Sequence, residues 1–291
     1  MKRILITGAT GHIGSEVLAS LCKSPQDLEI VAAVRNVEAA EQQFQPSSQL
    51  TFQVFDFEKP DTFSQAFQGV DSLFLLRPPQ LADVDRYFKP LLEAAKTSGI
   101  QQVVFLSVQG VETSNMIPHY KIEALIKNLG FQYVFVRPGY FMQNLTSTLL
   151  PEILKTQTIT LPAGQAKFNW VDVKNIGEAV AVLIKAFDLY KNRGYDITGS
   201  ENLSFQAVTH QMTIILNKPY RFKSINPIRF YFKKRKDGLT TGFALVMTLL
   251  HFLPRFQKEP EISNNFFKLT GKKPTTLVAF INREQHIFNK T

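Results

Sequence analysis

Short apolar runs alternate with segments of helical periodicity over the first 140 residues of the chain. The runs are dense in Val, Ile, Leu and Phe and lack a period-two alternation. They therefore predict parallel strands that are buried on both faces. The expected strands are residues 3–7, 29–34, 50–55, 72–76, 102–107 and 133–137, with one more near 195–198.

Helical periodicity fills the intervals between these runs. Ile13, Val17, Leu18 and Leu21 recur at i, i+4, i+5 and i+8, which places them on one face of a helix. Further helices are expected at 60–68, 83–98, 119–128 and 172–187, and Gly99 and Gly130 stand at expected helix ends. Strands that alternate with helices predict βαβ units and an open parallel sheet, hence an α/β fold.

Composition places the chain among ordinary globular proteins. Of its 291 residues, 44% are hydrophobic and 20% are charged. The opening apolar run is too short for a signal sequence, and the apolar run at 242–253 is shorter than the ~20 residues that span a bilayer. A single cysteine, Cys22, excludes an internal disulfide and fits a reducing compartment. We expect a cytoplasmic protein without a membrane partner.

The positive charge is concentrated in the last quarter. From Lys218 onward there are 15 Lys and Arg against 4 Asp and Glu, whereas residues 1–217 carry 18 against 20. Two interpretations stay open for the densest run, 233–236: a solvated basic turn, or a groove that attracts an anion. No nucleic-acid-binding motif accompanies the charge, so no nucleic-acid partner is expected.

The strongest chemical signal is a glycine motif that follows the first strand and opens the first helix. Gly8 permits the tight turn, Gly11 admits a pyrophosphate close to the backbone, and Gly14 allows close packing of helix on strand. The oriented amides of the helix N-terminus favour a negative charge. The motif predicts a Rossmann-type, doubly wound domain that binds a dinucleotide, and its residues are Gly8, Ala9, Thr10, Gly11, His12, Ile13 and Gly14.

The end of the second strand predicts which dinucleotide is preferred. Arg35 stands there in place of the carboxylate that would favour NAD, and a guanidinium suits a 2′-phosphate. NADP(H) is therefore favoured over NAD(H), although Arg35 could instead stack on adenine. Asp56 and Phe57, at the end of the third strand, are expected beside the adenine, and helix N-capping is the alternative role of Asp56.

The rhythm of strands and helices changes after residue 140. Residues 1–140 with about 169–199 are expected to form the NAD(P)-binding domain. The irregular, aromatic-rich segments at about 141–168 and 200–291 are expected to form a smaller, interleaved C-terminal cap that binds substrate. No internal repeat or low-complexity linker separates the two. Most of the phenylalanines of the second half are expected to be core, and some could furnish an apolar pocket.

The chain resembles the NmrA-like group of atypical short-chain dehydrogenases/reductases along almost its whole length. The resemblance rests on the glycine motif and on six further segments: 75–79 (LLRPP), 118–123 (PHYKIE), 136–144 (VRPGYFMQN), 171–173 (VDV), 197–204 (ITGSENLS) and 269–274 (LTGKKP). It implies that Leu75, Leu76 and Arg77 line the strand-four edge of the cofactor. It also implies that the segment from Tyr140 through Phe141 to Asn144 approaches the nicotinamide.

The Tyr-x-x-x-Lys pair of typical reductases in this superfamily is absent. Tyr120 and Lys121 are adjacent and point about 100° apart on a helix. By the family pattern His119 stands where the lysine falls and Asn115 where the tyrosine would be. His119 and Ser107 are the candidate catalytic residues: imidazole could donate a proton, and Ser107 matches a substrate-orienting serine. His119 is also a candidate cofactor-binding residue, because its ring could hydrogen-bond the ribose or a carbonyl oxygen. Plain structural roles remain open for both residues.

The resemblance implies an NADPH-dependent oxidoreductase that transfers hydride to a small quinone-like, azo or other aromatic acceptor. Water can protonate such products, so positioned hydride and an apolar pocket would suffice. The alternative is a non-catalytic NADP(H)-sensing regulator that binds a protein partner, and a sugar-nucleotide epimerase is the weakest option. No metal site is expected, and a homodimer is possible.

Overall fold

The computed structural model describes residues 2–23, 28–44, 49–113, 115 and 117–289. The chain divides into two compact units. Unit 1 comprises Met1–Pro138, Val173–Ile197 and Lys268–Gly271, and unit 2 comprises Gly139–Asp172, Thr198–Phe267 and Lys272–Thr291. Each unit is described by itself.

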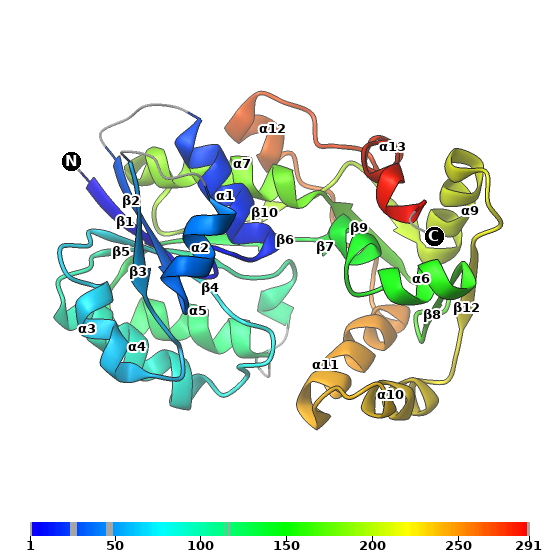
Figure 1. Cartoon of the computed structure of the whole chain (residues 1–291), viewed down its shortest axis with the longest axis horizontal. Coiled ribbons are helices and arrows are strands. Elements are labelled where there is room, and N and C mark those ends of the chain that lie inside the picture. The colour runs from blue at the N-terminus through cyan, green and yellow to red at the C-terminus, as the bar shows by residue number, and fades with distance from the viewer. Residues whose placement is uncertain (1, 24–27, 45–48, 114, 116, 290–291) are drawn as a thin grey trace. The chain divides into compact units, whose positions relative to one another are not determined.

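A seven-stranded parallel sheet forms the centre of unit 1 (Figure 1). In spatial order its strands are β10 (Arg193–Ile197), β6 (Gln132–Pro138), β5 (Gln102–Leu106), β4 (Ser72–Leu76), β1 (Lys2–Ile6), β2 (Leu28–Val34) and β3 (Leu50–Val54). The order reverses between β1 and β4, which is the position where open α/β sheets bind ligands beyond their carboxyl ends. The predicted Rossmann-type fold is therefore confirmed, and every predicted strand lies within two residues of an observed one.

Helices cover both faces of this sheet, with α1 and α7 on one side and α3, α4 and α5 on the other (Figure 1). They are α1 (His12–Cys22), α2 (Val37–Gln43), α3 (Phe63–Ala66), α4 (Val84–Thr97), α5 (Pro118–Asn128), α7 (Val173–Lys185) and α8 (Phe187–Tyr190), with 3-10 turns η1 (Pro60–Thr62) and η2 (Val111–Thr113). Gly177 of α7 makes the α1–α7 contact close, because a Cβ there would lie 2.7 Å from the backbone of Glu16. Gly99 and Gly130 follow α4 and α5 with φ of 90° and 70°, which confirms them as helix ends.

Two helical predictions for unit 1 need correction. The helix expected at 60–68 is a 3-10 turn followed by a single α-turn, η1 and α3, and the one expected at 172–187 breaks at Ala186 before α8. Helix α2 has no predicted counterpart, because Val37–Gln43 buries only Ala40 and so shows no apolar stripe.

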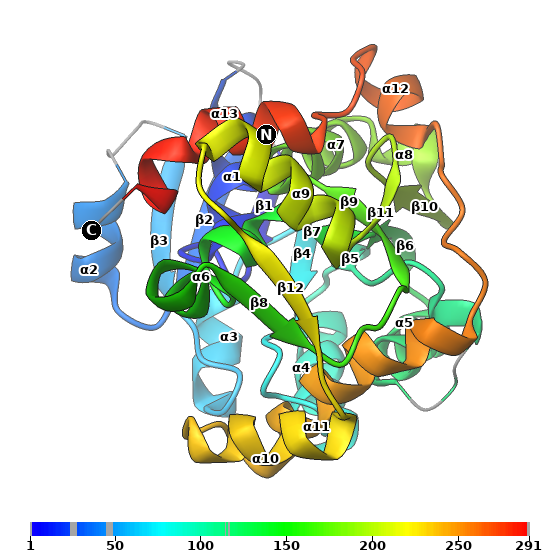
Figure 2. The ribbon, with the colours of Figure 1, turned by 90° about the vertical axis from the view of Figure 1, so that its right-hand side faces the viewer.

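Unit 2 contains more regular structure than its sequence pattern indicates. Strand β9 (Lys167–Val171) pairs with β11 (Asn202–Ser204) and β7 (Tyr140–Phe141), and β8 (Thr158–Leu161) pairs with β12 (Arg221–Ser224), as Figure 2 shows. Around them lie α6 (Leu150–Thr156), α9 (Phe205–Leu216), α10 (Pro227–Lys236), α11 (Thr241–Phe252), α13 (Leu277–Phe288) and the 3-10 turns η3 (Met142–Thr146) and η4 (Leu253–Phe256), while α12 (Asn265–Thr270) passes from unit 2 into unit 1. The expectation of an irregular segment at 200–280 is therefore wrong.

The aromatic residues of unit 2 are divided between core and surface. Trp170, Phe205 and Phe280 are fully buried in its hydrophobic core. Among the phenylalanines expected to be core, Phe230 and Phe266 are also buried, but Phe232, Phe256 and Phe267 are exposed. The prediction of a mostly core role thus holds for some of these residues and fails for others.

Helix α11 has an outer face that is more apolar than its inner face. The inner face buries Ala244, Met247, Thr248 and His251, whereas Leu245, Val246, Leu249 and Leu250 are 39–50% exposed. This helix lies beside the basic α10 (Figure 2). Among the described residues, no helix combines the length and the apolar character that crossing a membrane requires.

Candidate functional site at the carboxyl edge of the unit 1 sheet

The glycine motif forms a tight turn between β1 and α1. Gly8 has φ of +64°, and the Gly11 amide donates to the Gly8 carbonyl at 3.0 Å. A Cβ on Gly14 would lie 2.1 Å from the Gly8 oxygen, so any side chain there would force α1 away from the turn. The predicted spatial roles of Gly8 and Gly14 are thus visible in the backbone.

The N-terminus of α1 is open. Gly11 is its N-cap, no side chain caps it, and its first turn holds no acidic residue. Thr10, Gly11 and His12 are exposed, Ile13 is half-buried and Ala9 is buried. Uncapped amides at a helix N-terminus are a ready site for a phosphate group.

A residue outside the predicted set, Thr7, holds this turn against the neighbouring strand. Its hydroxyl donates to the Phe74 carbonyl at 3.0 Å and accepts from the Leu76 amide at 2.8 Å. The Leu76 side chain in turn lies 3.1 Å from where a Gly8 Cβ would stand. The glycine turn and the end of β4 are therefore one rigid assembly.

Arg35 lies exposed directly after β2 and has no partner among the described residues. The next residue, Asn36, caps α2 by accepting from the Ala39 amide at 3.0 Å. Gln43 at the other end of α2 donates to the Thr10 carbonyl at 3.3 Å. The structure thus leaves the Arg35 guanidinium free while it ties α2 to the glycine turn.

Asp56 and Phe57 follow β3 but differ in exposure. The Asp56 carboxylate accepts from the Glu58 amide at 3.0 Å, while Lys59 is the N-cap of η1, so the helix-capping alternative for Asp56 is wrong. Phe57 is 9% exposed and packs against the rings of Phe55 and Phe88 in the unit 1 core. Little of its surface is left for a ligand.

Arg77 folds back onto the loop that follows β4. Its Nη1 donates to the carbonyls of Pro78, Pro79 and Leu81 at 3.0–3.1 Å, and its Nε donates to His119 Nε2 at 3.4 Å. Burial lowers the pKa of Arg77 to about 10, so the group stays charged at neutral pH. Leu75, two residues earlier, is fully buried.

His119, in the first turn of α5, is a neutral imidazole. Burial first, and the Arg77 charge second, lower its pKa to about 3. Since Nε2 accepts from Arg77, the ring proton belongs on Nδ1. The lowered pKa disfavours the imidazolium form at neutral pH, and the catalytic role of His119 stays a prediction. Its neutral N–H can still donate a hydrogen bond.

Ser107 is buried after β5, and its amide donates to the Val136 carbonyl at 2.7 Å. Its hydroxyl has no hydrogen-bond partner at ordinary geometry. The nearby group whose pKa it affects is the buried Glu123 carboxyl. Burial raises the pKa of Glu123, and the weak approach of Ser107 opposes that rise. The hydroxyl therefore faces a charged cluster inside unit 1.

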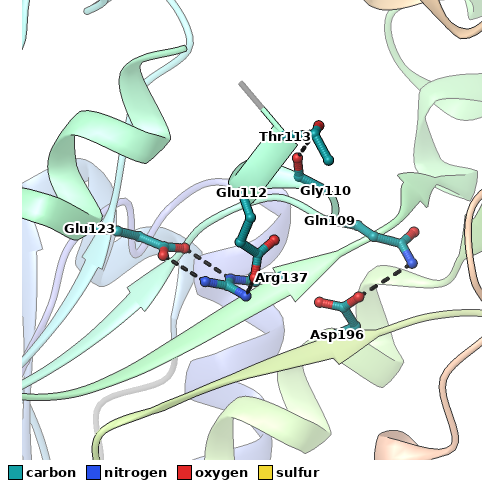
Figure 3. A network of polar contacts seen from close by, with 7 residues as sticks. All are labelled: Gln109, Gly110, Glu112, Thr113, Glu123, Arg137 and Asp196. Atoms are coloured by element: carbon teal, nitrogen blue, oxygen red, sulfur yellow. Dashed lines mark hydrogen bonds and ion pairs between the residues drawn. The ribbon is translucent and has the colours of Figure 1, made fainter. Parts of the chain in front are cut away.

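Figure 3 shows this cluster at the ends of β6 and β10. Arg137 makes a two-pronged ion pair with Glu123, at 3.0 and 2.7 Å, and also pairs with Glu112. Gln109 donates to Asp196 at 3.5 Å. A Cβ on Gly194 would stand 2.7 Å from the Arg137 guanidinium carbon, so the strand accepts the arginine because position 194 lacks a side chain.

Tyr140, Phe141 and Asn144 belong to unit 2. The Tyr140 hydroxyl lies 3.0 Å from Nε2 of His251, whose Nδ1 lies 2.7 Å from the Met247 carbonyl. Burial raises the pKa of Tyr140 and lowers that of His251 to about 4. Nδ1 of His251 must carry the ring proton, so the Tyr140 hydroxyl donates to Nε2 of His251. Asn144 also forms a hydrogen bond with the Tyr140 hydroxyl. The sequence pattern does not point to His251, because this residue is 111 positions from Tyr140 in the chain.

The two residues at the positions of the missing tyrosine–lysine pair differ in exposure: Asn115 is exposed and His119 is half-buried. Tyr120 and Lys121, which are adjacent on α5, are both exposed. Within the described part of the chain, no three His, Cys, Asp or Glu side chains gather in a way that could hold a metal ion.

The basic run 233–236 forms the last turn of α10, where positive side chains interact favourably with the helix dipole. Lys233 pairs with Glu152 at 2.7 Å and Lys234 with Asp237 at 3.1 Å, while Arg235 and Lys236 are exposed. The run is thus partly paired and partly solvated.

Comparison with known proteins supplies the context for this site. The sequence model of the NmrA-like family matches residues 1–280. The chain is 27% identical to an NAD(P)H azoreductase of Xenophilus azovorans, over 95% of this chain and 96% of that one. The structure of an NADPH-dependent quinone oxidoreductase of Escherichia coli, complexed with NADPH, superposes with a TM-score of 0.84 at 23% identity, covering 98% and 100% of the chains. NmrA, a negative transcriptional regulator, gives 0.74 at 16% identity, covering 97% and 94%.

Proposed function

Because this chain belongs to the NmrA-like family, we propose that it is an NADPH-dependent oxidoreductase acting on a small quinone-like, azo or other aromatic or conjugated acceptor. One observation carries the proposal: the glycine turn leads into an uncapped α1 N-terminus, and an unpaired Arg35 stands at the end of β2. A dinucleotide that bears a 2′-phosphate has an anionic group for each of these two features.

The residues of unit 1 have distinct tasks in this proposal. The amides at the start of α1 hold the diphosphate, and Arg35 binds the 2′-phosphate with a charged fork. Leu75 and Leu76 line the cofactor at the end of β4. When bound, the cofactor supplies a hydride, and the protein orients the acceptor against it and excludes water. The cofactor contacts of Tyr140, Phe141 and Asn144 rest on the family resemblance alone, and Ser107 and Phe57 have indirect roles.

Relatives support the class of acceptor. The Xenophilus azovorans protein is an azoreductase and the Escherichia coli protein a quinone oxidoreductase. Such acceptors can take their final proton from water, which suits a site whose His119 is neutral and whose Ser107 faces inward. A reducing compartment such as the cytoplasm is part of the same proposal and rests on the single cysteine.

A second candidate function is an NADP(H)-sensing regulator that binds a protein partner. It is favoured by the absence of the tyrosine–lysine pair, whose positions are occupied by Asn115 and His119, and by the exposure of Tyr120 and Lys121. It shares the cofactor site with the first candidate and differs in lacking an acceptor.

Two measurements on the purified protein separate these candidates. Calorimetry with NADPH and NADH should show binding with a preference for NADPH, and its failure for both nucleotides would remove both candidates. Loss of NADPH absorbance with a panel of quinones, azo dyes and enals should then show turnover. Binding of NADPH without turnover of any acceptor would favour the sensor.

A further inference from the structure

The half-buried guanidinium of Arg77 has no anionic partner among the described residues. Its four acceptors, three carbonyl oxygens and an imidazole nitrogen, are all neutral. Other half-buried arginines of this chain differ: Arg137 pairs with Glu112 and Glu123, and Arg283 pairs with Asp172 and Glu284. Neutral acceptors orient a cation without cancelling its charge. Arg77 therefore presents a net positive charge at the end of β4.

Part of this guanidinium remains available to a ligand. The contacts that hold Arg77 use Nε and Nη1, and Nη2 has no partner in the described part of the chain. Nη2 is also not among the atoms sealed inside the protein without a partner. Two N–H donors of a fixed cation thus face accessible space.

His119 holds this cation in place by accepting from its Nε at 3.4 Å. Because its Nε2 accepts from Arg77, its Nδ1 carries the ring proton, and no described residue accepts from Nδ1. The ring lies 6.0 Å from that of Phe105, which helps to fix its plane. Burial keeps the pKa of His119 low, so this arrangement persists at neutral pH.

The position of Arg77 in unit 1 connects it to the proposed cofactor. Arg77 follows Leu76, whose side chain packs on Gly8 of the glycine turn, and β4 and β1 are the strands between which the sheet order reverses. Donors at this position project from the same carboxyl edge as the turn.

We propose that Arg77 Nη2 binds the anionic oxygen or nitrogen that forms on the acceptor as it is reduced, while His119 Nε2 holds the guanidinium in place. This inference rests on the proposed function. A quinone or azo compound that takes up one hydride gains both its electrons, so one heteroatom of the acceptor becomes an anion while the nicotinamide is oxidised. Water then protonates that anion and leaves hydroxide, so no protein acid is required. A preorganised cation stabilises charge of this kind as it develops.

The first test measures anion binding without turnover. The probe is 4-nitrophenol, whose phenolate absorbs at longer wavelength than the phenol, titrated against pH in the presence of the full-length protein loaded with NADP⁺. The wild type should bind the phenolate about tenfold more tightly than the phenol, which lowers the apparent pKa of the bound probe by about one unit. Arg77→Met should abolish this preference, and Arg77→Lys, which keeps the charge, should retain part of it.

The matched control is Arg86→Met, an exposed arginine of the same unit that lies over the Tyr87 ring. It should bind the probe as the wild type does. Equal preference for phenolate in wild type and Arg77→Met, or no preference in the wild type, would overturn the inference. A thermal melt of Arg77→Met and Arg77→Lys identifies variants that fail to fold, and a folded Arg77→Lys then decides alone.

A second measurement separates this inference from the proposed function. Arg77→Met should bind NADPH within about twofold of the wild type while its kcat with a quinone falls at least tenfold. If NADPH affinity falls as far as kcat, Arg77 binds the cofactor and the inference is wrong. If the wild type turns over and the variant matches it, the inference fails while the proposed function stands. If the wild type consumes no NADPH with any acceptor, the proposed function fails first.

Discussion

Arg35 and Arg77 show how one residue type can have opposite environments in unit 1. Arg35 is exposed and unpaired, whereas Arg77 is half-buried and donates to four neutral acceptors. The first can bind or release a phosphate with little rearrangement of the protein, and the second is fixed before any ligand arrives. Preorganisation of this kind is a property of position and cannot be read from residue identity.

Replacing Arg35 with Asp should reverse the nucleotide preference. The change removes the guanidinium fork and adds a charge that repels the 2′-phosphate, so NADPH should bind about 10- to 100-fold more weakly. NADH should bind as well as before or better. Calorimetry with both nucleotides checks this, with the exposed Arg86→Asp as control, and an unchanged preference would remove Arg35 from the site.

The two buried histidines predict loss of stability in acid. In the folded protein the pKa values of His119 and His251 are about 3 and about 4, against about 6.5 when unfolded. Between these values the unfolded chain binds more protons, so stability falls as pH drops from about 6.5 towards 4. His251→Gln should reduce the stability that is lost between pH 6.5 and pH 4 by about 1–2 kcal/mol. Melting temperatures of wild type and variant from pH 7 to pH 4.5 measure it, and parallel curves would contradict it.

Element α1 depends on close approach to the turn that precedes it. Gly14→Ala would place a methyl group 2.1 Å from the Gly8 oxygen, so α1 must move. We expect a loss of about 1–3 kcal/mol of stability, as overpacking commonly costs, together with weaker NADPH binding. Gly242→Ala is the control, since nothing lies within 4 Å of a Cβ at that position of α11. Equal melting temperatures for Gly14→Ala and the wild type would argue against this packing.

Helix α5 is joined to β6 by the Glu123–Arg137 pair, and one turn earlier it carries His119 (Figure 3). Glu123→Leu should cost about 3–5 kcal/mol, because it leaves part of a buried charge unpaired. Arg137→Met in addition should restore much of this loss. Chemical unfolding of the single and double variants measures the coupling, and additive effects would show that the two side chains are independent.

Sequence pattern predicted the elements of unit 1 better than those of unit 2 for a physical reason. Strands buried on both faces are continuous apolar runs, and the glycine turn is a local device in which residues within seven positions meet. Helix α11 instead carries apolar residues on both its inner and its outer face, so no single stripe marks it. Contacts such as Thr7–Phe74, Glu123–Arg137 and Tyr140–His251 join residues distant in the chain, and no local pattern predicts them.

At the scale of the whole molecule, the surface of α11 contributes little to folding. Leu249 and Leu250 are 39% and 50% exposed, so their replacement by Gln together should change stability by less than about 0.5 kcal/mol and raise solubility. Met247→Gln is the contrasting variant, because Met247 is 6% exposed in the unit 2 core. Unfolding curves and precipitation thresholds test both. A large loss of stability in the Leu249/Leu250 variant would show that this face is covered in solution.

The chain passes between the two units five times, at 138–139, 172–173, 197–198, 267–268 and 271–272. During synthesis, β10 leaves the ribosome only after residues 139–172 of the other unit have already emerged. The sheet of unit 1 can therefore be completed only after the chain has passed through part of unit 2, so the two units cannot fold one after the other from the N-terminus.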